Sequence, residues 1–291
     1  MDIVIAIALL GGLGVGFGLI LAAASKVFYV ETDPRLEQLN GCLPGANCGG
    51  CGYAGCGAYA EAVLNGEAPI GACASGGNEC AQAMAAIMGV KAEAVTRKVA
   101  LVRCSGAKTY DKDGNLTKGA KVKANYEGFH DCLAASKVGG SGPLSCKYGC
   151  LGYGSCTKAC KYGAIKVVNG VAVVDEDLCV GCMACAAACP RQLIVPVEPD
   201  RNVVIACNSM AKGAATTRAC TVGCIGCGLC KKICPNGAIT IENNVARIDY
   251  EKCSQCGLCA TVCPKKLIKD SNVENLPDPN TQPKNGPEVK V

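Results

Sequence analysis

Residues 224–264 have the sequence CIGCGLCKKICPNGAITIENNVARIDYEKCSQCGLCATVCP, which contains the pattern Cys-x2-Cys-x2-Cys-x3-Cys-Pro twice. This is the spacing of bacterial proteins that hold two [4Fe–4S] clusters. Three thiolates of each run bind one cluster, and the fourth, beside proline, binds the other. The predicted ligand sets are therefore crossed between the two runs. One set is Cys224, Cys227, Cys230 and Cys263, and the other is Cys234, Cys253, Cys256 and Cys259.

A zinc ribbon or a disulfide framework is the alternative for a chain with 26 cysteines. Zinc sites use pairs of ligands separated by a longer loop, and they do not use runs of four that end in Cys-Pro. The ferredoxin spacing also indicates a reducing compartment, in which disulfides are rare. The pattern therefore favours iron–sulfur clusters over both alternatives.

Large apolar side chains are scarce for a chain of 291 residues, which has three Phe, no Trp and one His, His130. We expect the clusters to replace part of the core and the iron-free chain to be largely unfolded. The formal charge of +5 counts cysteine as neutral. Because a [4Fe–4S] cluster on four thiolates carries about −2, six clusters would bring the loaded protein to about −7.

Lysines follow the ligand cysteines closely, as at Lys161, at Lys231 and Lys232, and at Lys265 and Lys266. They either raise the cluster potentials and dock an acidic electron carrier, or form an ordinary solvated face. No aromatic residues alternate with them, so we expect no nucleic-acid partner.

Residues 3–24 carry no charge over 22 positions, a length of about 33 Å as a helix and enough to span a bilayer. Glycines such as Gly12 and Gly16 give this segment the Gly-xxx-Gly spacing of helices that pack against other membrane helices. A cleaved signal peptide is the alternative, because small residues end the segment, but no Lys or Arg precedes it. Lys26 and Arg35 follow it, which predicts a single-pass anchor in the inner (cytoplasmic) membrane with the cluster domains on the cytoplasmic side.

The segment LPGANCGGCGYAGC at 43–56 begins a second cysteine group with spacings x2, x4 and x16. Its glycines let the backbone bend close to a cluster. We predict a small helical [4Fe–4S] domain, covered by helices at 58–64 and 81–95; a structural zinc site is the alternative. The predicted ligands are Cys48, Cys51, Cys56 and Cys73. Cys42 and Cys80 lie outside this set and are interpreted as small apolar residues, although either could replace a ligand.

Residues 99–270 repeat themselves. The run that ends at Pro190 matches the run that ends at Pro264 at an offset of 74 residues, and 166–177 and 240–251 are predicted hairpins with Asn-Gly or Asn-Asn turns. We therefore predict two tandem bacterial-type 2[4Fe–4S] ferredoxin modules, related by duplication.

The first module is irregular, because its leading run has spacings x3, x5 and x3 and ends with Lys161 where proline is usual. One predicted set is Cys160, Cys179, Cys182 and Cys185, and the other is Cys146, Cys150, Cys156 and Cys189.

Four further cysteines precede the two modules, Cys104 and Cys132 before the first and Cys207 and Cys220 before the second. Cys104 and Cys207 each follow a predicted strand, and we expect the two halves to meet and hold a sixth cluster. The offset of 74 aligns Cys220 with Cys146 and not with Cys132, so the ligands of these two clusters could be exchanged. Buried thiols are the alternative for all four, which would leave five clusters.

The predicted fold is α+β and dominated by iron–sulfur clusters. The predicted domains are an anchor at 1–30, a [4Fe–4S] domain at 31–98, tandem ferredoxin modules at 99–270 and a disordered tail at 271–291. No Gly-x-Gly-x-x-Gly follows a strand, and no acid–base group can be named. The chain thus has no complete substrate site of its own, and its chemistry is one-electron transfer.

The anchor, the 43–56 motif with Cys73, and the polyferredoxin with GCIGCGLCKKICP together resemble the B subunit of the Rnf complex, the ion-translocating ferredoxin:NAD+ oxidoreductase. The resemblance extends from residue 1 to about residue 269. It implies that reduced ferredoxin donates electrons, that the clusters pass them to other membrane and NAD-linked subunits, and that Na+ or H+ is transported. A membrane-anchored polyferredoxin of a hydrogenase or another reductase is the alternative.

Overall fold

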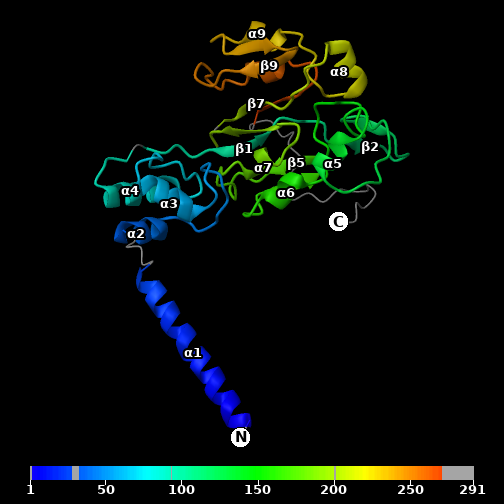
Figure 1. The fold of residues 1–291 in the computed structure, drawn as a ribbon. Helices are drawn as coiled ribbons and strands as arrows, with labels where there is room; N and C mark the ends of the chain where they lie inside the picture. The colour runs from blue at the N-terminus through cyan, green and yellow to red at the C-terminus, as the bar shows by residue number, and fades with distance from the viewer. Residues whose placement is uncertain (1, 28–32, 93, 200, 271–291) are drawn as a thin grey trace.

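The computed structural model of the chain describes residues 2–27, 33–92, 94–199 and 201–270 (Figure 1). The predicted tail at 271–291 lies outside the described residues. Helices and strands of the described part are, in chain order, α1 (Asp2–Val27), α2 (Pro34–Cys42), α3 (Cys56–Leu64), α4 (Gly77–Met88), β1 (Val99–Val102), β2 (Thr109–Tyr110), β3 (Leu116–Lys118), α5 (Cys132–Lys137), α6 (Ser155–Ala159), β4 (Ile165–Val168), β5 (Val171–Val174), α7 (Ala184–Ala187), β6 (Ile194–Val197), β7 (Val203–Ile205), α8 (Gly213–Ala219), α9 (Leu229–Ile233), β8 (Ile239–Glu242), β9 (Val245–Ile248), α10 (Leu258–Thr261) and β10 (Ile268–Asp270).

Helix α1 contains the segment predicted to cross the membrane. Its described apolar side chains, such as Leu10, Phe17 and Leu21, are exposed. Among the residues that the structure describes, no helix is both long enough and apolar enough to span a bilayer. The anchor at 3–24 therefore stays a prediction from the sequence.

Helices α2, α3 and α4 form a small helical unit around one core, in which Leu39, Tyr59 and Met84 are fully buried. The predicted helix at 58–64 is confirmed and begins two residues earlier. The helix predicted at 81–95 is wrong at both ends, because α4 begins at Gly77 and ends at Met88. It ends there because Gly89 adopts a left-handed conformation (φ 68°), a common way for glycine to terminate a helix.

Both predicted hairpins are present. Strands β4 and β5 pair so that Val168 faces Val171, with Asn169 and Gly170 at positive φ (50° and 77°). Strands β8 and β9 have the same two-residue turn, formed by an Asn pair. Two consecutive residues at positive φ form a type I′ turn, whose twist matches that of the flanking strands.

Each ferredoxin module is closed by a strand pair that joins its two ends. Strand β1 precedes the first module and pairs antiparallel with β6, which follows the last cysteine of that module. Strand β7 precedes the second module and pairs in the same way with β10. The predicted strands before Cys104 and Cys207 are therefore confirmed, and the two modules have the same closure.

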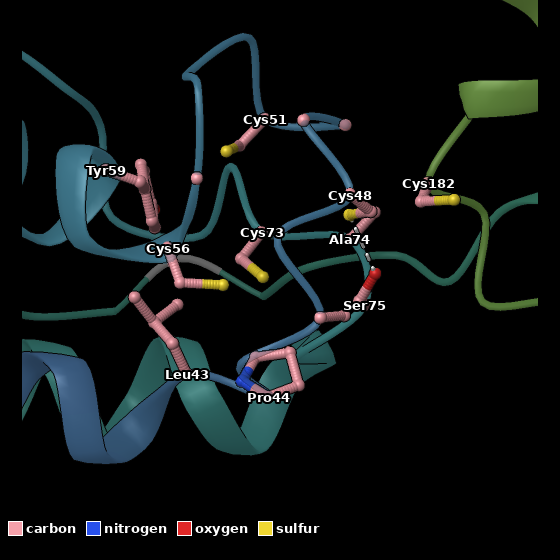
Figure 2. A pocket seen from close by; sticks show the side chains of 14 residues that line it. Leu43, Pro44, Cys48, Cys51, Cys56, Tyr59, Cys73, Ala74, Ser75 and Cys182 are labelled. Atoms are coloured by element: carbon pink, nitrogen blue, oxygen red, sulfur yellow. Dashed lines mark hydrogen bonds between the residues drawn. The ribbon is translucent and has the colours of Figure 1, made fainter. Parts of the chain in front are cut away.

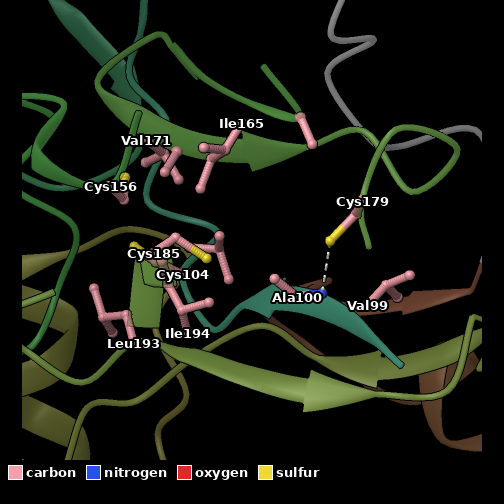
Figure 3. Packing of buried hydrophobic residues seen from close by; sticks show 13 residues of the cluster. Val99, Ala100, Cys104, Cys156, Ile165, Val171, Cys179, Cys185, Leu193 and Ile194 are labelled. Carbon is pink, nitrogen blue, oxygen red and sulfur yellow. Dashed lines mark hydrogen bonds between the residues drawn. The ribbon is translucent and has the colours of Figure 1, made fainter. Parts of the chain in front are cut away.

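Cysteines are part of every core. The first module buries Cys104, Cys156, Cys179 and Cys185 among Val, Ile and Leu side chains (Figure 3). The second module and the helical unit bury cysteines in the same manner. A fourth, smaller core lies under the segment around α5 and contains Cys132 and Cys220. Because so many core positions are thiols, the apolar packing of these modules is incomplete without a group that fills the space between them.

Iron removal is expected to unfold the ferredoxin modules. Treatment with a chelator under mild oxidation should abolish the cooperative thermal transition in circular dichroism and increase the rate of proteolysis many-fold. Protein incubated anaerobically without chelator is the control. An iron-free chain that retained a cooperative transition at the same temperature would contradict this expectation.

Candidate iron–sulfur sites

The first site is a cavity between the loop at 43–56, α3 and the turn before α4 (Figure 2). It contains about 340 Å³ of atom-free space, counting the part that is open to solvent. Asn47, at a positive φ of 45°, accepts a hydrogen bond through Oδ1 from the N–H of Cys56 at 2.8 Å and so shapes the loop. The four cysteines expected from the x2, x4, x16 spacing line this cavity, namely Cys48, Cys51, Cys56 and Cys73.

Tyr59 of α3 supports the fourth of these thiols. Its ring is fully buried, and its hydroxyl donates to the carbonyl of Pro69 at 2.9 Å and accepts from the N–H of Ala72 at 3.2 Å. Because Ala72 directly precedes Cys73, these bonds hold the Cys73 segment against α3.

Cys42 and Cys80 do not line this cavity. Burial raises the pKa of Cys80 to about 11, and its thiol lies 3.8 Å from Sδ of Met84. A protonated thiol next to a thioether behaves as a small apolar group.

A second cavity lies in the first module beside β1. The N–H of Ala100 donates to Sγ of Cys179 at 3.4 Å (Figure 3). The ring of Tyr162 also lines this cavity. The cysteines that line it form the crossed set expected from the sequence, Cys160, Cys179, Cys182 and Cys185.

The third cavity brings together cysteines that the sequence pattern did not group. Its cysteines are Cys132, Cys150, Cys156 and Cys189. The two modules align at an offset of 74 residues, and in this alignment Tyr153 of the first module occupies the position of Cys227 in the second. The first module therefore lacks one thiol of the regular pattern. The segment that carries α5 is inserted between β1 and the module and supplies Cys132 in place of the missing thiol.

Asp131 and Ser155 position Cys132. Asp131 caps α5 by accepting hydrogen bonds from the N–H groups of Leu133 and Ala134 at 2.8 and 3.0 Å. Its other oxygen accepts from the Ser155 hydroxyl at 2.7 Å, and that hydroxyl accepts from the N–H of Cys132 at 2.8 Å. The hydrogen bond from Ser155, with those from the backbone, holds the pKa of Asp131 below its usual value.

The fourth cavity joins the two modules. All its thiols are buried, and they are Cys104, Cys146, Cys207 and Cys220.

The hydrogen bonds around this cavity repeat across the two modules. Sγ of Cys104 accepts from the N–H of Gly106 at 3.4 Å and of Cys150 at 3.3 Å. Sγ of Cys207 accepts from the N–H of Ser209 at 3.5 Å and of Cys224 at 3.3 Å. The segments that precede the two modules thus meet around one set of thiols. This set contains Cys146, whereas the sequence analysis first assigned Cys132 to it.

The second module contributes two further sets. One lines a cavity and has the predicted crossed composition, Cys224, Cys227, Cys230 and Cys263. The other is the set predicted from the sequence, in which Cys259 is buried, and burial together with Cys230, Cys253 and Cys256 raises its pKa to about 11. Cys234 is half-buried and packs against the core that contains Cys259. Cys227 and Cys256 are exposed, unlike any other cysteine of the described residues.

Half-buried cations lie near the thiols of the first module and the joining cavity. Burial lowers the pKa of Arg103, of Lys108 and of Lys269, and the thiols of Cys150 and Cys104 act in the opposite direction on the two lysines. In the part of the chain that the structure describes, none of these three is in an ion pair with a carboxylate, and Nε of Arg103 has no hydrogen-bond partner. Such cations favour an anionic group among the thiols.

These sites have the space and the surroundings that suit a multi-iron cluster. The thiols line atom-free spaces of about 340–360 Å³, counting the parts open to solvent, and backbone N–H groups point at several sulfurs. Thiolate ligands, N–H donors to sulfur and nearby cations are the surroundings of [4Fe–4S] clusters.

Three family models match the chain in these regions. They are described as "Putative Fe-S cluster" at residues 43–75, "4Fe-4S binding domain" at 171–194 and "4Fe-4S dicluster domain" at 223–267. The fold and the sites therefore define an iron–sulfur protein of the ferredoxin type that carries [4Fe–4S] clusters.

Characterised relatives identify the family more closely. The chain is 42% identical over 86% of its length to the B subunit of the Na(+)-translocating ferredoxin:NAD(+) oxidoreductase complex of Acetobacterium woodii, and covers 73% of that protein. It is 39% identical over 85% of its length to the B subunit of the ion-translocating oxidoreductase complex of Methanosarcina acetivorans, and covers 90% of it. It is 42% identical over 83% of its length to the B subunit of the proton-translocating ferredoxin:NAD(+) oxidoreductase complex of Clostridium ljungdahlii, and covers 82% of it. The chain belongs to the family of B subunits of ion-translocating oxidoreductase (Rnf) complexes.

Replacing Asp131 with alanine is expected to loosen Cys132. Loss of the N-cap should lower the free energy of unfolding by about 1 kcal/mol and make iron loss to a chelator several-fold faster. Absorbance at the cluster bands measures that loss.

Asp111→Ala is the control, because Asp111 also accepts two backbone N–H bonds, at 3.0 and 2.7 Å, but in the exposed β2–β3 hairpin. Equal iron loss from wild type and both variants would show that the cap does not hold the Cys132 thiol.

Proposed function

We propose that this chain carries single electrons through six [4Fe–4S] clusters, as the electron-transfer component of a membrane ion-translocating ferredoxin:NAD+ oxidoreductase. The observation that carries the proposal is the gathering of 20 cysteines around five cavities, four to each, and the spacing of Cys234, Cys253, Cys256 and Cys259 supports a sixth set. When bound, the clusters supply one-electron oxidation and reduction, and the chain supplies ligands, spacing and local charge.

Five of the proposed ligand sets follow the cavities that the cysteines line, and the sixth, which contains Cys234, follows the sequence spacing. They are Cys48, Cys51, Cys56 and Cys73; Cys160, Cys179, Cys182 and Cys185; Cys132, Cys150, Cys156 and Cys189; Cys104, Cys146, Cys207 and Cys220; Cys224, Cys227, Cys230 and Cys263; and Cys234, Cys253, Cys256 and Cys259.

Contacts between neighbouring sets support this order as one continuous series. Cys182 lines both the first and the second cavity. Within each module, a thiol of one set acts on the pKa of a thiol of the next, as Cys185 does on Cys156 and Cys230 on Cys259. At the joining cavity, Sγ of Cys104 accepts a hydrogen bond from the N–H of Cys150, and Sγ of Cys207 accepts one from the N–H of Cys224.

The exposed end of this series lies in the second module and suits a protein donor. Helices α9 and α10 pack together beside the exposed thiols of Cys227 and Cys256. Their outer residues form a mixed apolar and basic docking face, which consists of Leu229, Lys231, Lys232, Ile233 and Leu258. Such a face favours an acidic electron carrier, and the names of two relatives make reduced ferredoxin the proposed donor.

The opposite end of the series lies in the helical domain that follows the predicted anchor at 3–24. The uncharged sequence of this segment supports a single-pass attachment to the cytoplasmic membrane, with the domains at 31–98 and 99–270 on its cytoplasmic side. Other membrane and NAD-linked subunits would accept the electrons there. Coupling to Na+ or H+ belongs to those subunits, because one uncharged span offers no ion pathway.

The content of iron and acid-labile sulfide tests the proposal directly. Protein purified without oxygen should contain about 24 iron and 24 sulfide per chain and lose its brown colour with dithionite. About 20 of each would reduce the series to five clusters, and a colourless zinc-loaded protein would refute it.

The grouping of Cys132 predicts a rescue by its counterpart position. Cys132→Ala should lower the iron content by about four per chain, since one cluster loses a ligand. Adding Tyr153→Cys should restore it, because position 153 corresponds to Cys227. Cys80→Ala, which removes a buried thiol outside the six sets, is the control and should change nothing. A Cys132→Ala variant with full iron content would refute the grouping.

Reversing charge on the docking face is expected to slow reduction by ferredoxin. Lys231→Glu with Lys232→Glu should lower the second-order rate about tenfold at low ionic strength, and the difference should vanish at high salt. Stopped-flow absorbance measures the rate.

Lys112→Glu with Lys118→Glu makes the same charge change at the β2–β3 hairpin and serves as the control. If the variant with Lys231→Glu and Lys232→Glu were reduced at the wild-type rate in low salt, this face would be excluded as the docking site.

A further inference from the structure

The first and second thiol sets meet at one close contact between the helical domain and the first ferredoxin module. Cys182, from the second set, approaches the N-terminal cavity on the side of Cys48 (Figure 2). A Cβ atom on Gly50 would lie 2.3 Å from the carbonyl oxygen of Cys182 and 3.0 Å from its Cα. Real Cβ atoms do not come so close to backbone, so any side chain at position 50 would push the two domains apart.

Gly50 is required here for the close approach and not for its conformation. Its φ lies outside the left-handed region, so alanine could adopt the same backbone. Glycine is the residue that lets two backbones approach closely.

Two basic side chains tie the domains together at this contact. Nζ of Lys161 donates to the carbonyls of Ala46 and Asn47 at 2.6 and 3.0 Å. Arg97, between the domains, donates to the carbonyl of Glu176 at 2.6 Å. Lys161 stands where the ferredoxin pattern usually has proline, and a proline could not make these bonds.

Tyr162 follows Lys161 and stands between the two sets. Tyr162 lines the second cavity, and its hydroxyl is buried. Ser75 and Cys48 of the first site lie close to that hydroxyl.

We propose that Gly50, Lys161 and Tyr162 form a junction that holds the Cys48 and Cys182 thiol sets close enough for direct electron transfer. This inference rests on the proposed function and names the positioning residues for one of its steps. In that step the reduced cluster of one set loses one electron and the oxidised cluster of the other gains it. No covalent bond changes.

Gly50→Ala is the sharpest test, because the added methyl group must widen the contact. Electron paramagnetic resonance of the full-length, dithionite-reduced protein should show weaker magnetic coupling between clusters, and transfer followed by freeze-quench should be several-fold slower. Gly41→Ala is the matched control, since a Cβ at Gly41 meets nothing within 4 Å.

Lys161→Met should have the same two effects, and Lys161→Arg should restore both. Lys158→Met is its control, because it removes an equal charge nearby while Nζ of Lys158 bonds to the carbonyl of His130 and not to the helical domain.

Iron content separates the possible failures. If the fully iron-loaded Gly50→Ala and Lys161→Met variants kept the wild-type magnetic coupling and the wild-type rate of electron transfer, the proposed junction would be overturned and the proposed function would stand. Wild-type protein that contains no clusters, or whose clusters cannot be reduced, would overturn the proposed function instead.

Discussion

Four thiols must meet around each cavity, and the rest of the structure depends on this requirement. Short helices and two-residue hairpin turns bring cysteines from distant parts of the chain to one point, where they share each core with aliphatic side chains. The strand pairs β1–β6 and β7–β10 close each module so that its first and last elements stay together. The spacing of the cysteines in the sequence and the arrangement of the strands therefore serve the same requirement.

Duplication explains both the regularity of the modules and their one exception. The second module keeps the full ferredoxin pattern, whereas the first has Tyr153 where a thiol is expected, and the α5 segment supplies Cys132. Cys146 is then left for the joining cavity, opposite its counterpart Cys220. The α5 segment therefore places Cys132 in the third cavity and packs against Cys220 and Val222 of the second module.

Charge is distributed along the series in a way that suits its parts. The thiols of the joining cavity are all buried, with Arg103 lining it and Lys269 near Cys104, which favours an anionic cluster there. The far end exposes two thiols beside lysines and apolar side chains, where a transient partner can bind and leave. Charge near the joining cavity affects the stability of an anionic group there, and surface charge affects the approach of a partner protein.

The sequence by itself determined the class of protein, the hairpins and the regular thiol sets, because cluster ligands and turn residues follow local spacing rules. The same reasoning misplaced the ends of α4, and it could not decide between Cys132 and Cys146. Only the tertiary structure placed Cys132 in the third cavity and Cys146 in the joining cavity. It also revealed the contact between Gly50 and Cys182. Both depend on segments far apart in the chain, whose approach is set by packing and not by any local pattern.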